Sequence, residues 1–125
     1  MIAGVGTDII EIERIKKASE KNCFLSRCFT DTERRYATAP EKLAGLFAAK
    51  EAAVKALGEG FKRFLPADVE IIHDKNGKPS VKIKGLEEAV IHVSISHCRQ
   101  YAVAFAVYET EESHAFGGSF ANEND

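Results

Sequence analysis

Residues 46–58 read Leu-Phe-Ala-Ala-Lys-Glu-Ala-Ala-Val-Lys-Ala-Leu-Gly, a stretch rich in helix formers that ends on glycine. At about 100° per residue, apolar side chains share one arc of this helix: Leu43, Leu46, Phe47, Ala53, Val54 and Leu57. Lys50 projects from the middle of that arc, and Glu51 and Lys55 lie together at its edge. We therefore predict a long helix, opened by Pro40, whose core-facing surface contains charge.

The three charges on this helix have two interpretations. A charge that faces a core must be paired, hydrated or bound to a ligand, because its isolated burial costs several kcal/mol. Glu51 and Lys55 can form an ordinary ion pair while Lys50 extends to solvent along its apolar stem. Alternatively, all three charges belong to a binding site.

Composition limits the class of protein. The chain has 125 residues, of which 45% are hydrophobic, as expected for a single globular domain. Cys23, Cys28 and Cys98 are odd in number and lack CxxC spacing, which argues against a disulfide framework and a zinc site and favours the cytoplasm. No apolar run approaches the ~20 residues of a membrane span, and the start does not resemble a signal peptide.

Charge is unevenly distributed along the chain. The formal net charge is −2, but residues 110–125 contain four acids and no lysine or arginine. We predict one domain over residues 1–109, which is mildly basic, followed by an acidic and flexible tail over residues 110–125.

The first residues combine a strand pattern with an acid. Residues 1–12 form an apolar run interrupted by Gly4, Gly6 and Asp8, with the glycines at positions where another backbone or a ligand approaches closely. Asp8 could cap a helix over residues 9–21, because Glu11 follows three residues later as in a capping box. A functional role for Asp8 is the alternative.

A row of basic residues follows in the predicted first helix. Arg14, Lys17 and Lys21 lie on one side of it. The row is either a solvated face or a docking surface for an acidic partner.

The remaining elements alternate short helices and strands. We predict a helix over residues 30–37 capped by Thr30 or Asp31, a hairpin turning at Asn76-Gly77, and two further strands. The hairpin strands cover residues 69–73 and 80–84, and the later strands cover residues 91–97 and 101–108.

The last predicted strand is apolar on both faces, and a histidine ends the strand before it. Residues 101–108 have no polar face, so this strand requires a cover on both sides, from helices and another subunit or from a closed sheet. His97 ends the preceding strand on its apolar side, where it is either a structural residue or a ligand contact. Gly58 and Gly60, beside basic residues, could let a backbone approach phosphates, although an ordinary helix end looks the same.

Four motifs together resemble a known family. They are Gly4-Val5-Gly6-Thr7-Asp8-Ile9, Phe47-Ala48-Ala49-Lys50-Glu51-Ala52 with Lys55, Asn76-Gly77-Lys78-Pro79, and Val93-Ser94-Ile95-Ser96-His97. Their order and spacing over residues 1–109 resemble the holo-[acyl-carrier-protein] synthases, the small bacterial type of 4′-phosphopantetheinyl transferase. The agreement of four separated motifs makes the resemblance specific.

The resemblance implies a fold and an activity. The fold is α+β, mainly an antiparallel sheet with a long helix packed on it, assembled as a trimer with coenzyme A at the subunit boundaries. The activity is magnesium-dependent transfer of 4′-phosphopantetheine from coenzyme A to a serine of apo acyl carrier protein. The products are holo acyl carrier protein, for fatty acid biosynthesis, and adenosine 3′,5′-bisphosphate.

The resemblance also implies roles for individual residues. Asp8 and Glu51 match the acids that hold Mg²⁺, for which Mn²⁺ could substitute. Lys55 matches a lysine that contacts phosphate and is a candidate general base, with a metal-bound water as the rival. Residues near coenzyme A are matched by Lys50, Gly58, Gly60 and His97. Arg14 matches an arginine that meets the carrier protein, so the basic row with Lys17 and Lys21 gains a partner.

Two features depart from the family pattern. Leu46 stands where many members have arginine, and Lys42, Lys62 or Arg63 could supply the missing charge. The tail over residues 110–125 is longer than usual.

Two other functions remain compatible with the residues alone. One is a non-catalytic protein that binds an acidic partner, with Asp8 as a cap and Glu51 in a salt bridge. The other is a different magnesium-dependent nucleotide enzyme, although neither GxxxxGK[ST] nor GxGxxG occurs.

Overall fold

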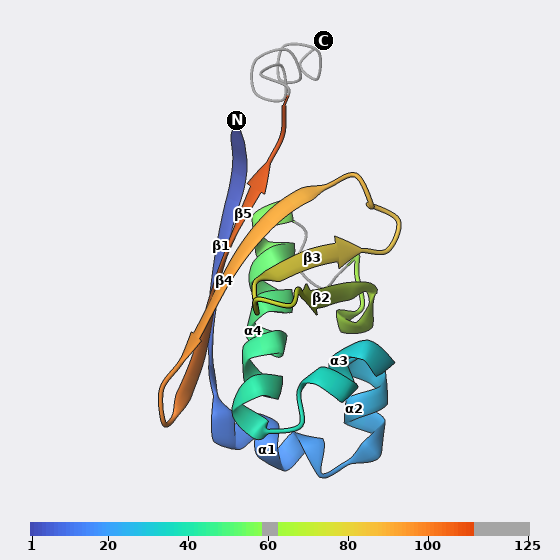
Figure 1. Cartoon of the computed structure of the whole chain (residues 1–125), viewed down its shortest axis with the longest axis vertical. Helices are drawn as coiled ribbons and strands as arrows, with labels where there is room; N and C mark the ends of the chain where they lie inside the picture. Colours follow the sequence, from blue (N-terminus) through green and yellow to red (C-terminus); the bar gives the residue numbers. More distant parts are fainter. Residues whose placement is uncertain (59–62, 112–125) are drawn as a thin grey trace.

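A long helix, α4 (Pro40–Leu57), lies between a sheet and a layer made of short helices and one hairpin (Figure 1). The computed structural model describes residues 1–58 and 63–111. The other elements are β1 (Ile2–Glu11), α1 (Ile12–Ser19), α2 (Asn22–Cys28), α3 (Asp31–Tyr36), the 3₁₀ turn η2 (Pro66–Asp68), β2 (Val69–His73), β3 (Pro79–Ile83), β4 (Val90–His97) and β5 (Tyr101–Glu109). The predicted α+β architecture, with a long helix packed on an antiparallel sheet, is confirmed.

The sheet has three antiparallel strands in the order β1-β5-β4. Asp8 on β1 lies opposite Ala104 on the central strand, which in turn lies opposite Ile95 on β4. Side chains alternate between the two faces of a strand. The alanines of β5 are therefore buried together: Ala102, Ala104 and Ala106. The intervening side chains of β5, including Val103 and Phe105, are exposed.

Two glycines let α4 approach β1 closely. A Cβ atom at Gly4 would overlap the carbonyl oxygen of Ala56, and one at Gly6 would overlap that of Ala52. Only a residue without a side chain fits at these positions. The predicted close approach of another backbone at the two glycines is confirmed, and that backbone belongs to α4.

The first helix begins later than predicted. Asp8 lies within β1, which continues to Glu11, and α1 begins at Ile12. The prediction that Asp8 caps a helix over residues 9–21 is therefore wrong. The apolar periodicity of residues 9–15 fits a helix as well as a strand, and pairing with β5 decided for the strand.

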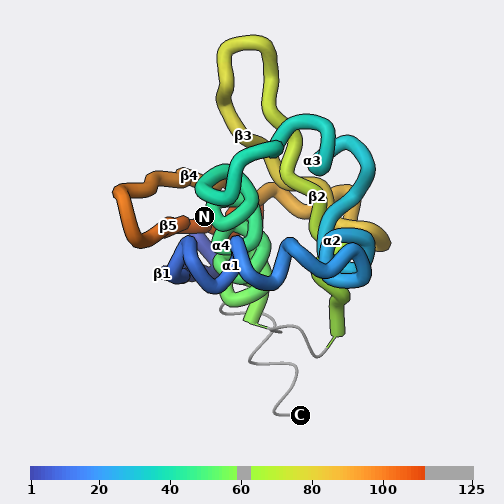
Figure 2. The backbone as a smooth tube through the Cα atoms, turned by 90° about the horizontal axis from the view of Figure 1, so that it is seen from below, coloured from blue at the N-terminus to red at the C-terminus, as the bar shows by residue number. Residues whose placement is uncertain are grey.

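The layer on the far side of α4 contains one helix that we did not predict. Helix α2 carries Phe24, whose ring packs against the rings of Phe29 and Phe47. Helix α3 is capped by Thr30, one of the two predicted caps, through a capping box with Glu33. Strands β2 and β3 pair as predicted, and their connection projects from one side of the molecule in Figure 2.

The end of α4 also agrees with the sequence. Gly58 adopts φ = 83°, the left-handed conformation expected of a glycine that ends a helix. The predictions for Gly60, Lys62 and most of the acidic tail lie outside the described residues. Within residues 1–58 and 63–111, no helix is both long and apolar enough to cross a membrane.

We expect Gly6→Ala to destabilise the fold by about 2–4 kcal/mol, because the new methyl group overlaps the backbone of α4 and overpacks the interface. Gly58→Ala is the matched control. An added Cβ meets nothing within 4 Å there, so only the positive φ is strained, at about 1 kcal/mol. Urea unfolding of both variants measures the difference. Equal destabilisation would show that the helix does not depend on this close approach.

Candidate active site

Two carboxylates and a lysine meet where β1 passes α4. Asp8 follows Gly6 by two residues and so shares the helix-facing side of the strand. Lys55 Nζ donates a hydrogen bond to the carbonyl oxygen of Thr7 at 3.0 Å and lies 3.5 Å from Asp8 Oδ1. Glu51 precedes Lys55 by one helical turn. Lys55 therefore connects to Asp8 in this structure, and not to Glu51 as an ordinary helix pair would.

The two carboxylates interact electrostatically. Burial raises the pKa of Glu51, and the charge of Asp8 raises it further, while Lys55 acts in the opposite direction. Burial likewise raises the pKa of Asp8, opposed by Lys55. Two partly buried acids thus lie beside the ammonium group of Lys55, whose side chain is 51% exposed. Counted over the described residues, this group has surplus negative charge that a cation would neutralise.

The donor set suits a hard divalent cation. Within the described part of the chain, no three His, Cys, Asp or Glu side chains form a metal-binding group. Asp8 and Glu51 would therefore supply two oxygen ligands and leave the other positions to water and phosphate, the arrangement typical of Mg²⁺.

Lys50 lies in the interior instead of the site. Its side chain is 0% exposed, and its Nζ donates to Glu33 Oε1 at 2.7 Å and to the carbonyl oxygens of Pro66 and Val69 at 2.9 and 2.5 Å. All three donors of the ammonium group are thus taken. The prediction that Lys50 binds coenzyme A is wrong, and so is the alternative that it extends to solvent. Burial lowers its pKa, and Glu33 counteracts this.

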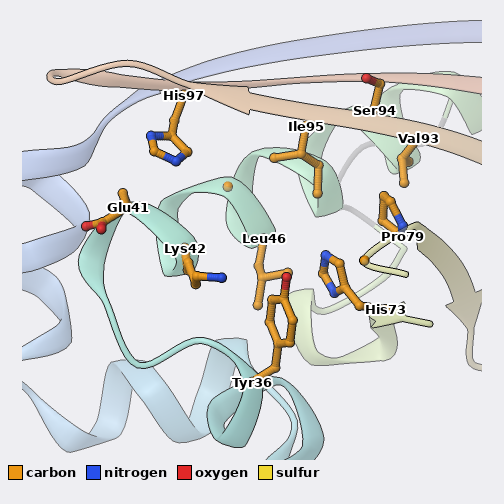
Figure 3. Close-up of a pocket in the computed structure, with 12 residues that line it drawn as sticks. Tyr36, Glu41, Lys42, Leu46, His73, Pro79, Val93, Ser94, Ile95 and His97 are labelled. Atoms are coloured by element: carbon orange, nitrogen blue, oxygen red, sulfur yellow. The ribbon is translucent and has the colours of Figure 1, made fainter. Parts of the chain in front are cut away.

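His97 lies in a separate pocket of about 310 Å³ on the other side of α4 (Figure 3). The pocket is enclosed by the first turns of α4, the end of β4, and the hairpin of β2 and β3. Its polar and charged lining residues are Tyr36, Glu41, Lys42, His73, Ser94 and His97. The ring of His97 is exposed, and its Nδ1 lies 3.4 Å from the carbonyl oxygen of Cys98.

The Asp8 site and this pocket occupy opposite edges of one sheet. Strand β5 separates β1, which carries Asp8, from β4, which carries His97. On α4, Glu51 and Lys42 point in nearly opposite directions, since nine residues turn a helix by about 180° beyond two full turns. One chain therefore presents two separate sites, which do not face each other.

Comparison with known proteins identifies the family of this chain. The family model described as the 4′-phosphopantetheinyl transferase superfamily matches residues 4–106. The chain belongs to this superfamily. It is 48% identical to the holo-[acyl-carrier-protein] synthase of Clostridium tetani over 124 residues, which cover 89% of this chain and 98% of that protein. It is 45% identical to that of Oceanobacillus iheyensis, with 90% of this chain and all of the relative covered.

Solved structures of the same superfamily share the fold. The holo-(acyl-carrier-protein) synthase of Bacillus anthracis, in complex with CoA (3′,5′-ADP), is 42% identical with a TM-score of 0.78, covering 89% of this chain and 99% of that chain. The enzyme of Neisseria meningitidis is 34% identical with a TM-score of 0.79, covering 88% of this chain and all of that chain.

Leu46, at the position where the resemblance leads us to expect arginine, lines the pocket near Lys42. Leu46 is only 2% exposed, whereas Lys42, one turn earlier on α4, is exposed. Of the candidates for the missing charge, Arg63 lies over the ring of Phe64 and Lys62 is outside the described residues. Lys42 is the described cation that shares the pocket.

Sequence reasoning missed the aromatic pair of this pocket. Tyr36 ends α3 and His73 ends β2, and their rings stack with centroids 3.9 Å apart. Neither position belongs to a recognisable motif. The contact joins two elements that are remote in sequence, so no local sequence pattern predicts it.

The basic row is exposed as the sequence indicates. Arg14 and Lys17 lie on α1, whereas Lys21 lies beyond its end and precedes α2. All three side chains are exposed and form no ion pair within the described residues.

We expect Lys50→Met to destabilise the fold by about 3–5 kcal/mol, because it leaves the carboxylate of Glu33 buried without its counter-charge. Combining it with Glu33→Gln removes that charge, so the double variant should unfold at a higher urea concentration than Lys50→Met alone. A double variant less stable than the single one would show that the two charges are not coupled.

Proposed function

We propose that this chain transfers the 4′-phosphopantetheine group from coenzyme A to a serine hydroxyl of apo acyl carrier protein. The constellation of Asp8, Glu51 and Lys55 carries the proposal, because it offers two oxygen ligands and one ammonium group beside each other. The names of the relatives support the substrates: they are holo-[acyl-carrier-protein] synthases, and one solved structure contains CoA (3′,5′-ADP). The free cysteines agree with a cytoplasmic location.

Asp8 and Glu51 hold Mg²⁺ in this proposal. When bound, the ion neutralises the negative charge that develops on the pyrophosphate oxygens of coenzyme A. The carboxylates fit this role because they lie close enough for the charge of Asp8 to raise the pKa of Glu51, and a bound cation would relieve this repulsion. The two side chains come from rigid elements, a strand and the middle of a long helix, so their spacing is fixed.

Lys55 holds the donor phosphate in the same site. Its Nζ is oriented by the carbonyl oxygen of Thr7 and by Asp8 and retains donor capacity toward solvent, because the side chain is half exposed. The serine oxygen of the carrier protein attacks the phosphorus that bears pantetheine, and the bond from that phosphorus to the departing bisphosphate breaks. The serine proton leaves to a base next to the site; Lys55 can accept it only as the uncharged amine and not as the ammonium group that pairs with Asp8.

The complete site forms between copies of the chain. The sheet face opposite α4 exposes a set of large apolar side chains: Val5 56%, Ile9 65%, Val103 38% and Phe105 48%. An apolar face of this kind is typical of an interface. A trimer around this face would bring the pocket with His97 on one copy toward the Asp8 site of the next. Coenzyme A could then contact both half-sites.

The basic row docks the acceptor. Arg14, Lys17 and Lys21 are exposed and without ion-pair partners among the described residues. Such a row attracts an acidic protein and orients it before contact. In this proposal, it guides the acyl carrier protein so that its serine approaches the Asp8 site.

We expect the protein, incubated with coenzyme A, Mg²⁺ and an apo acyl carrier protein, to add phosphopantetheine, which mass spectrometry of the carrier detects. Asp8→Ala and Glu51→Ala should each lower the rate by about 10²- to 10³-fold, since each removes charge-stabilising ligands from the transition state. Glu88→Ala, which removes an exposed acid on a turn, is the control. Lost activity accompanied by loss of the folded state would instead indicate that the acids are structural.

We expect two inactive variants to restore each other if the site lies between copies. Glu51→Ala damages the metal half-site, and His97→Asp places a negative charge in the pocket. Random mixing in a trimer makes about a quarter of the interfaces intact. Co-refolded subunits should therefore recover about that fraction of wild-type activity. Recovery no greater than the sum of the separate variants would contradict a shared site.

A further inference from the structure

One ion pair lies on the face of the sheet opposite α4. The Nε2 atom of His92 on β4 lies 2.9 Å from Oε1 of Glu109 on β5, and the two side chains are 61% and 49% exposed. Figure 1 shows α4 against the other side of the sheet formed by β1, β5 and β4. Neither residue belongs to the Asp8 site or lines the pocket that contains His97. The pair is therefore available for a role that the transfer chemistry does not use.

Apolar side chains surround this pair. In the register of the sheet, Glu109 lies opposite Val90 on one neighbouring strand and opposite Ile2 on the other. His92 lies opposite Val107. Residues paired in this way project to the same face of an antiparallel sheet. Ile2 and Val90 are both exposed large hydrophobic residues. The pair is thus a charged group within the apolar face through which copies of the chain associate in our proposal.

The free energy of burying this pair depends on one proton. Moving a charge out of water is unfavourable, and a neighbouring opposite charge offsets this only while both charges are present and hydrogen-bonded. When His92 is protonated, the pair as a whole is electrically neutral. When His92 is uncharged, the carboxylate of Glu109 enters the interface as an isolated charge, which is much less favourable. Histidine changes its charge near neutral pH, so a small change of pH decides between the two cases.

The other titratable groups on this face lie on β1 and β5, since the remaining polar side chains that β4 presents to it are serines. The hydrogen bond with His92 lowers the pKa of Glu109, burial opposes this, and the charges of His92 and of the amino terminus lower it further. The ammonium group of Met1 donates to a backbone carbonyl oxygen at the same end of the sheet. Glu11 and Tyr101 lie opposite each other at the far end. Met1 is therefore the rival source of positive charge for Glu109.

We propose that association of the chain through this sheet face takes up one proton at each His92–Glu109 pair, so that copies assemble at mildly acidic pH and separate at alkaline pH. The inference rests on the part of the proposed function in which copies associate through this face. The stabilisation is complete below the range in which a free histidine titrates, around pH 6.5, and is lost as the pH rises above it. Because association completes the transfer site, the same proton controls how much of the protein has a complete site.

The test is sedimentation equilibrium of the full chain at constant ionic strength, at pH values on both sides of the histidine range, about 5.5 and about 8.5. Each measurement gives the protein concentration at which half of the chains are assembled. Release of one proton per pair lowers the association constant by about tenfold per pH unit for each pair. The half-assembly concentration of the wild type should therefore rise by about tenfold or more between the two pH values.

Two variants should act in opposite directions. Glu109→Gln keeps the shape and an acceptor oxygen but has no charge, so its half-assembly concentration should change by less than about twofold with pH and lie below that of the wild type at alkaline pH. His92→Gln leaves the carboxylate of Glu109 without its counter-charge, so it should assemble at both pH values no better than the wild type does at alkaline pH.

Glu20→Gln is the matched control, because Glu20 is an exposed acid at the end of α1, outside the sheet. It should retain the pH dependence of the wild type. Circular dichroism of each variant at both pH values establishes that the chain is folded. Since His92 and Glu109 are exposed in the single chain, neither substitution should disturb its fold.

The outcomes separate this inference from the transfer function. Wild-type assembly that does not change with pH, or a chain that stays monomeric at both pH values, would overturn the inference even if the protein transfers phosphopantetheine. Wild-type pH dependence retained in His92→Gln would also overturn it and would assign the positive charge to Met1. Absence of transfer by a chain that assembles with the expected pH dependence would refute the transfer function and leave the proton linkage standing.

Discussion

The close approach of α4 to β1 is the constraint on which the rest of the structure depends. Gly4 and Gly6 let the helix backbone come within contact distance of the strand, at Ala56 and Ala52. Because Asp8 lies two residues beyond Gly6 on the same face, it meets the helix one turn further toward its start. The placement of Asp8 beside α4 is thus a direct consequence of backbone packing.

The opposite side of α4 is fixed by a different force. The buried ion pair of Lys50 and Glu33 joins the helix to α3, and the same carboxylate accepts a hydrogen bond from the backbone of Ile71 on β2. Buried pairs of this kind add little net stability over an apolar packing, but they penalise any arrangement that separates the charges. Tyr36 lies on α3 and His73 on β2. The Lys50–Glu33 ion pair joins these two elements, so it also positions the stacked rings that form one wall of the pocket.

In our proposal, the uncovered sheet face lets so short a chain complete its active site by association with another copy. A three-stranded sheet with one helix layer leaves its other face exposed, here with apolar side chains such as Val5 and Phe105. Association through this face would bury that surface and supply the second wall of a substrate cleft, as in our proposal. The chain then needs no second domain to enclose a donor as long as coenzyme A.

The sequence by itself determined the elements whose signals are local. Propensity, periodicity and turn chemistry predict the long helix that begins at Pro40, the short helix capped by Thr30 or Asp31, the hairpin around Asn76-Gly77 and the apolar character of both faces of β5. The resemblance carried by four motifs also identified the superfamily, as the match over residues 4–106 confirms. The roles assigned to Asp8, Glu51, Lys55 and His97 stay predictions.

Only the tertiary structure decided where ambiguous residues go. The periodicity around Asp8 fits a helix as well as a strand, and the pairing of β1 with β5 settled it. Lys50 and Glu51 are neighbours in one motif, yet one is buried with Glu33 and the other lies beside Asp8, because successive helix residues point about 100° apart into different layers. The stack of Tyr36 on His73 joins remote elements. Such contacts depend on how layers pack, and no local pattern encodes them.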